Sequence, residues 1–195
     1  MERSLTVLGI AGSLRVGSIN RALLEAAQEL APHHMTIQIF DLTPIPMYNS
    51  ELDTDERRPQ VVNEFKQAIA AADGMLIATP EYNYSIPGVL KNALDWASRP
   101  GGNSPLKMKP TAIMGATGGM WGTVRAQTHL RDILASTGTP VVLKPEVLVA
   151  NAYQKFDEQC RLIDEPTRQF VSDLLSALER LITRLHSPDT EPILA

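Results

Sequence analysis

The sequence predicts an α/β protein in which a five-stranded parallel sheet carries helices on both faces. Five short apolar runs alternate, along 195 residues, with segments whose apolar residues recur at helical spacing. The runs are almost continuously apolar, which is typical of strands that are covered on both faces in a parallel sheet. Repeated strand–helix units connect such strands by right-handed crossovers. The length suits one domain, which we expect to span residues 1–186.

The strand predictions follow the apolar runs in order. The first run breaks at Gly12, and the third is stopped by Pro80. The five strands are expected at residues 5–11, 36–40, 74–79, 111–116 and 140–143. Five strands favour the order 2-1-3-4-5 of a flavodoxin-like three-layer sandwich, whose ligands bind beyond the carboxyl ends of the strands where the order reverses. The loops after strands 1, 3 and 4 are therefore the candidate site.

The helix predictions follow the intervening segments. The first helix runs from Ile19 to about Leu30, and the others lie at 58–72, 87–98, 122–137 and 166–186. The clearest apolar stripe belongs to the last helix and consists of Phe170, Val171, Leu174, Leu175, Leu178, Leu181, Ile182 and Leu185. The tail at 187–195 contains two prolines, and we expect it to be disordered.

Composition excludes several classes of protein. The net charge is −4 and no basic cluster occurs, which argues against a nucleic-acid partner. No apolar run approaches the roughly 18 residues that cross a bilayer, so no membrane association is expected. The first strand begins too soon for a signal peptide, and we expect a cytoplasmic protein. The single cysteine, Cys160, excludes an internal disulfide, and no metal site is expected.

The loop after the first strand has the features of an anion site. It joins a strand directly to a helix N-terminus, where free backbone N–H groups and the helix dipole favour a negative charge. Arg15 adds a fixed positive charge, and Ser13, Ser18 and Asn20 add hydrogen-bond donors. A phosphate monoester is the expected guest.

Other interpretations of this loop remain open at this point. It lacks the lysine of a nucleoside-triphosphate P-loop, and its glycines do not match G-x-G-x-x-G. Asp41, after the second strand, could imitate the ribose-binding acid of a dinucleotide fold. Gly12 and Gly17 could equally be turn glycines, with Ser18 an ordinary helix N-cap.

The other two loops suit a planar ring. Tyr82, Asn83 and Tyr84 follow the third strand and offer aromatic rings for stacking and an amide for a polar edge. Gly118 and Gly119 follow the fourth strand and let the backbone approach a ligand closely. Taken singly, the tyrosines could be surface or interface residues and the glycines a turn. Together the three loops suit a ligand with a phosphate at one end and a flat polar ring at the other, and FMN fits that description.

Two motifs resemble the NADPH-dependent FMN reductase family of flavodoxin-like proteins, which includes quinone, azo-dye and chromate reductases. One is Gly12-Ser-Leu-Arg-x-x-Ser-x-Asn20, similar to the family's phosphate loop; the other is the segment from Thr79 to Trp96, similar to its flavin-ring motif. A weaker likeness covers Gly115 to Gly119. The resemblance implies that FMN is bound by Ser13, Arg15, Ser18, Ile19 and Asn20 at its phosphate, by Pro80, Glu81, Tyr82 and Asn83 along its ring, and by Thr117, Gly118 and Gly119 on the other side.

The resemblance also implies a homo-oligomer, either a dimer or a tetramer. Some members join dimers through a tyrosine–arginine–glutamate network, and Tyr82, Arg125 and Glu146 match parts of it. Thr128 stands where those members carry a second tyrosine, which weakens the case for the tetramer.

The implied reaction is an NAD(P)H oxidoreductase reaction on bound FMN. NADPH or NADH would reduce FMN, which would then reduce a small-molecule acceptor such as a quinone, an azo compound, chromate or free flavin. No catalytic side chain is expected, because FMN carries the chemistry. For NADPH, Arg99 is a candidate contact of the 2′-phosphate. The alternatives are a flavodoxin-type electron carrier, which does not react with NAD(P)H directly, and an α/β domain without flavin.

Overall fold

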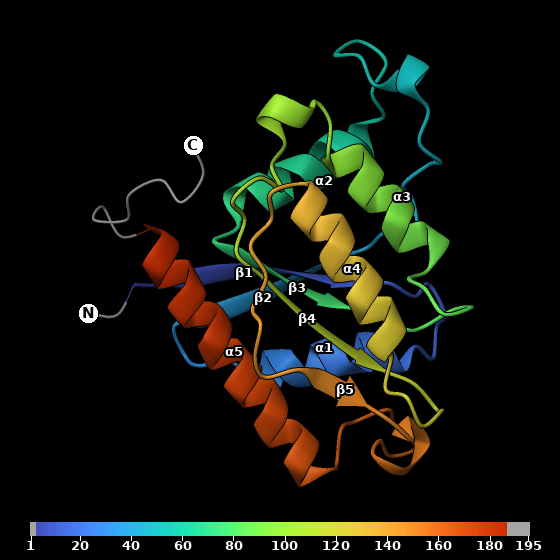
Figure 1. Ribbon diagram of the computed structural model, residues 1–195, viewed down its shortest axis with the longest axis vertical. Helices are drawn as coiled ribbons and strands as arrows, with labels where there is room; N and C mark the ends of the chain where they lie inside the picture. The colour runs from blue at the N-terminus through green and yellow to red at the C-terminus, as the bar shows by residue number, and fades with distance from the viewer. Residues whose placement is uncertain (1–2, 187–195) are drawn as a thin grey trace.

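The predicted strand order is confirmed. The computed structural model describes residues 3–186 and contains one parallel sheet in the order β2-β1-β3-β4-β5 (Figure 1). The strands are β1 (Leu5–Ala11), β2 (Met35–Phe40), β3 (Gly74–Ala78), β4 (Thr111–Ala116) and β5 (Val147–Val149). The first four agree with the sequence-based boundaries to within one residue.

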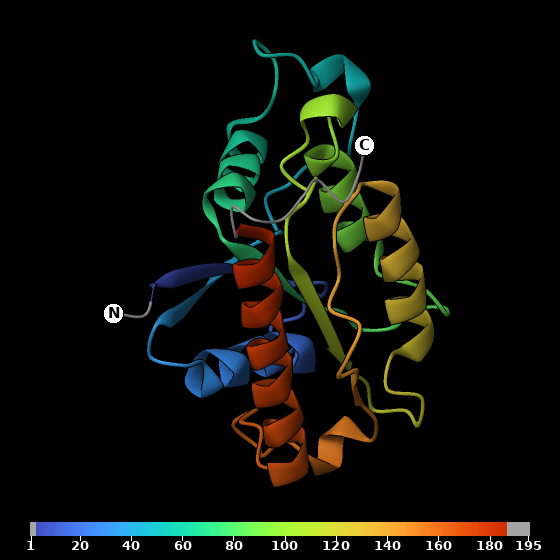
Figure 2. The ribbon, with the colours of Figure 1, turned by 60° about the vertical axis from the view of Figure 1, so that its left-hand side comes forward.

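Within residues 3–186, five α-helices cover the two faces of the sheet (Figure 1 and Figure 2). On one face, α1 and α5 pack on β-strand residues such as Val7 and Met114. On the other face, α2, α3 and α4 pack on residues such as Ile10 and Ile77. The helices are α1 (Ile19–Leu30), α2 (Gln60–Ala71), α3 (Gly88–Ala97), α4 (Val124–Ser136) and α5 (Glu165–His186), with short 3₁₀ turns η1 (Ser50–Leu52), η2 (Gly101–Asn103) and η3 (Ala152–Gln154).

The fifth strand was misplaced by the sequence pattern. Residues 140–143 make a single bridge, between Val141 and Thr111, and Leu143 is exposed. The strand that completes the sheet is β5, in which Val147 pairs with Met114. Thr111 is the first residue of β4. The segment after Val141 therefore continues along β4 until regular pairing begins between Val147 and Met114. This correction shifts the loop that follows the strand to residues 150–154.

Two smaller expectations also change. Phe170, which was expected on the buried stripe of the last helix, is half exposed. The edge strand β2 alternates between buried and exposed residues, because only its inner neighbour β1 and one helix layer cover it. The tail at 187–195, expected to be disordered, lies outside the described residues. Within residues 3–186, no helix is both long and apolar enough to cross a bilayer.

The parallel strands bring all of their carboxyl ends to one edge of the sheet. The loops after β1, β3 and β4 gather along this edge, on the right-hand side of Figure 1. Because α3 runs back antiparallel to β3, its C-terminal end and Arg99 lie at the opposite edge. Arg99 is therefore badly placed to contact a cosubstrate at the predicted site.

Candidate functional site

The three predicted loops enclose one pocket, which we call the rim pocket. Its volume is about 110 Å³, and it opens at the carboxyl edge of the sheet. Apart from Asn83 and Gly119, every residue predicted to bind the cofactor lines it. The full lining is Ser13, Arg15, Ser18, Ile19, Asn20, Pro80, Glu81, Tyr82, Ala116, Thr117, Gly118 and Tyr153.

The N-terminus of α1 faces this pocket with an uncompensated dipole. Ser18 is the N-cap, and its Oγ accepts a hydrogen bond from the backbone N–H of Arg21 at 3.3 Å. The preceding N–H groups, those of Ile19 and Asn20, have no acceptor within the helix. The first turn carries no acidic side chain, and Arg15 is exposed beside it. The arrangement therefore favours an anion.

Asn20 has a structural role that the sequence could not show. Its side chain is buried and pairs twice with the backbone of Ala116: Nδ2 donates to the carbonyl oxygen and Oδ1 accepts from the N–H, both at 2.9 Å. The side chain thus fastens the start of α1 to the end of β4. Asn20 can therefore donate its backbone N–H to an anion, because its side-chain amide is already bonded to Ala116.

The loop after β3 is folded into a tight hairpin. Tyr82 and Ser85 exchange two backbone hydrogen bonds, at 2.9 and 3.0 Å. The two residues at the tip, Asn83 and Tyr84, have φ values of 50° and 67°, which is the pattern of a type I′ turn. Tyr82 lies within hydrogen-bond distance of Ser13, with 3.3 Å between the two hydroxyl oxygens. The hairpin therefore touches the phosphate loop directly.

Glu81 fixes this hairpin to α4. Its carboxylate accepts hydrogen bonds from the backbone N–H groups of Arg125 at 2.9 Å and Ala126 at 3.1 Å. It also accepts from the Arg125 guanidinium at 3.2 Å. Thr123, the N-cap residue of α4, makes no capping bond with its side chain, so Glu81 supplies the cap from a distant loop.

Arg125 is held between two aromatic rings. Its guanidinium carbon lies 4.2 Å from the ring centre of Tyr84 and 5.1 Å from that of Trp121. Both rings are more than half exposed. Within one chain Arg125 thus pairs with Glu81, whereas Glu146 pairs with Lys144, which lowers the pKa of Glu146. The tyrosine–arginine–glutamate network was expected between dimers, so it needs a neighbouring subunit and stays a prediction.

The loop after β4 is fastened to the segment that follows β5. Thr117 donates its N–H to Val149 and accepts from Ala152, at 2.9 and 3.0 Å. Gly118 lies under the ring of Tyr153, where an added Cβ would come within 2.3 Å of a ring carbon. A side chain at this position would therefore have to displace the Tyr153 ring.

Tyr153 and Ala116 line the rim pocket but were not predicted from the sequence. Tyr153 is exposed and lines the rim pocket from the loop after β5. Placing the fifth strand at 147–149 would have brought this loop to the same edge, and its lone aromatic would then have been a candidate. Ala116 is the last residue of β4 and contributes backbone, which no residue type reveals.

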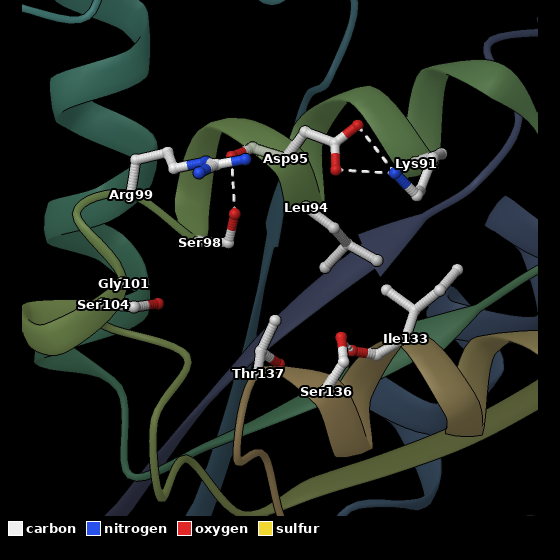
Figure 3. A pocket seen from close by; sticks show the side chains of 10 residues that line it. All are labelled: Lys91, Leu94, Asp95, Ser98, Arg99, Gly101, Ser104, Ile133, Ser136 and Thr137. Carbon is white, nitrogen blue, oxygen red and sulfur yellow. Dashed lines mark hydrogen bonds and ion pairs between the residues drawn. The ribbon is translucent and has the colours of Figure 1, made fainter.

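A second pocket lies at the opposite edge of the sheet, between the C-terminal ends of α3 and α4. It has a volume of about 350 Å³ and includes Arg99. Figure 3 shows Lys91 paired with Asp95 at its border, at 2.7 and 2.8 Å. Arg99 lies over the ring of Tyr48, 5.7 Å from its centre, and the pocket shares no residue with the rim pocket.

Comparisons with known proteins place the chain among flavin-dependent reductases by sequence. The model of the NADPH-dependent FMN reductase family matches residues 5–154. An NAD(P)H-dependent FMN reductase of Pseudomonas aeruginosa is 46% identical over 185 residues, which cover 95% of this chain and 99% of that protein. A quinone reductase of Escherichia coli K12 is 37% identical, with the same coverage.

A solved structure agrees as well. The flavoenzyme NAD(P)H:acceptor oxidoreductase FerB of Paracoccus denitrificans is 34% identical, with a TM-score of 0.84 over 92% of this chain and 97% of that one. The match to the family model, the identities and the shared architecture show that this chain belongs to the NADPH-dependent FMN reductase family.

Proposed function

We propose that the rim pocket holds FMN and that the protein uses NAD(P)H to reduce quinones through it. The observation that carries this proposal is the convergence of an anion-binding helix N-terminus, an aromatic hairpin and a glycine loop on one pocket. Membership of the family supports the cofactor, and relatives named quinone reductases support the acceptor class.

The residues at the phosphate end fit a dianionic phosphate. The N–H groups of Ile19 and Asn20, the hydroxyls of Ser13 and Ser18, and the Arg15 guanidinium are donors, and the first turn of α1 contributes no competing carboxylate. A volume of about 110 Å³ suits the phosphate end of a ligand rather than the whole of it. The ring would then lie over the open rim.

The residues at the ring end fit a flat heterocycle. Glu81 and the type I′ turn hold the Pro80–Asn83 backbone in place, while Gly118 lets the opposite loop lie low beneath Tyr153. Bound FMN supplies the redox chemistry, accepting reducing equivalents from NAD(P)H and delivering them to the acceptor. The loops would position the ring, and their backbone N–H groups would stabilise the negative charge of its reduced form.

A homo-oligomer would bury the aromatic surface beside the site. Met120 and Trp121 are 70% and 59% exposed, and Tyr84 is 64% exposed. A second copy of the chain, covering these residues in a dimer or tetramer, would remove them from water and bring its own Glu146 near Arg125. Sedimentation of the wild type against Trp121→Ser tests this arrangement, because loss of the interface should shift the variant toward the monomer.

Binding of FMN can be tested at Arg15. Replacing Arg15 with alanine should weaken FMN binding by about 1.5–3 kcal/mol, the range for hydrogen bonds to charged groups. Titration of the apoprotein, followed by quenching of FMN fluorescence, measures the affinity. The matched control is Arg57→Ala, since Arg57 is an exposed arginine on the β2–α2 connection. Equal affinities for the two variants would show that the phosphate binds elsewhere.

The enzymatic assignment is tested without oxygen. NADPH or NADH should bleach the absorbance of the bound FMN, and a simple quinone should restore it over many turnovers. A flavodoxin-type carrier would instead hold FMN but remain yellow with either nucleotide.

A further inference from the structure

A further cavity at the same edge of the sheet adjoins the rim pocket, and we call it the β2 groove. It lies between the phosphate loop and the end of β2, and its volume is about 530 Å³, within the range of small-molecule sites. Ser13 and Arg15 line both cavities, so the two adjoin at the phosphate loop. The rim pocket and the proposed flavin site leave this groove unexplained.

The phosphate loop presents apolar side chains to this groove. Leu14 is 49% exposed, and Val16 is fully exposed. Phosphate binding needs neither of them, because it uses the serines, the arginine and the helix N-terminus of the same loop. Phe40, the last residue of β2, is partly buried on the other side of the groove. A flat heterocycle between these side chains would cover apolar surface that water now contacts.

The groove also contains a carboxylate that pairs with no cation in the described residues. Asp41 directly follows β2, and its Oδ1 accepts a hydrogen bond from the backbone N–H of Thr43 at 2.9 Å. This bond, more than the weaker field of Arg21, lowers the pKa of Asp41, so the side chain is charged at neutral pH. The groove is also lined by Arg21, which is already paired with Glu25 at 2.9 Å, and by Arg15, which the groove shares with the rim pocket.

We propose that the β2 groove binds the adenosine half of the cosubstrate, and that Asp41 selects NADH over NADPH. The Asp41 carboxylate accepts hydrogen bonds from the ribose hydroxyls, while Leu14 and Val16 cover the adenine. The 2′-phosphate of NADPH meets a fixed negative charge at the same place. The inference rests on the proposed function, because the nicotinamide of the same molecule must reach FMN over the rim pocket.

The test is the coenzyme preference of the FMN-loaded enzyme. Anaerobic stopped-flow measurements give the rate of FMN bleaching against the concentration of each nucleotide. Asp41→Asn keeps an oxygen for the Thr43 N–H but removes the charge. It should change the ratio of kcat/KM for NADPH to that for NADH by roughly tenfold in favour of NADPH, mainly through KM, as expected for the loss of a like charge in a partly exposed groove. The control, Asp55→Asn, alters a fully exposed carboxylate elsewhere.

Binding without redox chemistry gives an independent readout. ADP-ribose and its 2′-phosphorylated form are titrated calorimetrically into the FMN-loaded wild type and Asp41→Asn. The wild type should prefer ADP-ribose, the variant should lose that preference, and Leu14→Ser should weaken both ligands.

The failure of this inference differs from failure of the proposed function. If both nucleotides bleach FMN and Asp41→Asn leaves their kcat/KM ratio unchanged, the assignment of the groove is wrong while the FMN assignment stands. If neither nucleotide bleaches the bound FMN, the proposed function itself fails.

Discussion

Glu81 provides the sharpest test of how the site is held together. Its side chain is 13% exposed, and its carboxylate joins the β3–α3 hairpin to the first turn of α4 through two backbone N–H groups and one guanidinium. Glu81→Ala removes all three bonds. Glu81→Gln keeps one oxygen that can accept hydrogen bonds from the backbone, but this oxygen carries no charge.

The expected cost follows from these contacts. A hydrogen bond to a charged group contributes about 1.5–3 kcal/mol, and loss of a helix cap costs about 0.5–2 kcal/mol. The three bonds share one acceptor group and are not additive, and water can reach part of the freed helix end. We therefore expect about 2–4 kcal/mol of destabilisation for Glu81→Ala and about 1–2 kcal/mol for Glu81→Gln. For a chain of this size, the alanine variant should melt roughly 5–12 °C lower.

The assay is urea denaturation of the apoprotein, with FMN titration of the same samples. Affinity for FMN should fall in the order wild type, Glu81→Gln, Glu81→Ala, because the hairpin loses its anchor. Glu56→Ala, at an exposed carboxylate of the β2–α2 connection, is the control and should change stability by less than about 0.5 kcal/mol. If Glu81→Ala were as stable as this control, the carboxylate would not be the cap of α4.

Three further variants test other parts of the site. Gly118→Ala should weaken FMN binding by displacing the Tyr153 ring, whereas Gly119→Ala, with 3.9 Å to its nearest neighbour, should bind normally; equal titrations would contradict this. Asn20→Ala should cost roughly 2–4 kcal/mol in chemical denaturation, because two buried groups of Ala116 lose their partners, and a neutral result would refute the clamp. Thr167, through its hydroxyl and its N–H, lowers the pKa of Asp164. The ionised carboxylate therefore stabilises the fold fully above the ordinary pKa of aspartate, and this stabilisation is lost as the pH falls. Asp164→Asn should flatten the decline of the free energy of unfolding between about pH 5 and 2, and an unchanged slope would refute this.

The sequence predicted the sheet well because its strands are buried on both faces. Apolar runs of that kind are distinctive, and their order follows from the crossovers. The failure at 140–143 has a physical reason: this run and 147–149 are both short and apolar, and pattern alone cannot tell which pairs with Met114. That choice depends on how far the chain must travel along β4.

The sequence predicted where in the fold the candidate site lies, but not which residues its polar side chains contact. Ser13, Arg15 and Tyr82 line one pocket, as expected from the residue types of their loops. The partners of Asn20 and Glu81 lie 96 and 44 residues away in the sequence, so these polar side chains could not be distinguished from ligands of a cofactor. Tyr153 escaped notice because its loop follows the misplaced strand.

The two hydrogen bonds between the Asn20 side chain and the Ala116 backbone affect how a ligand binds. Because one buried amide locks the start of α1 to the end of β4, the two ends of the rim pocket cannot drift apart independently. The empty protein should already have the shape of the loaded one, so little conformational entropy is lost on binding. Crystals of the two forms would then superpose closely around these loops, and tightness of binding would reflect direct contacts rather than rearrangement.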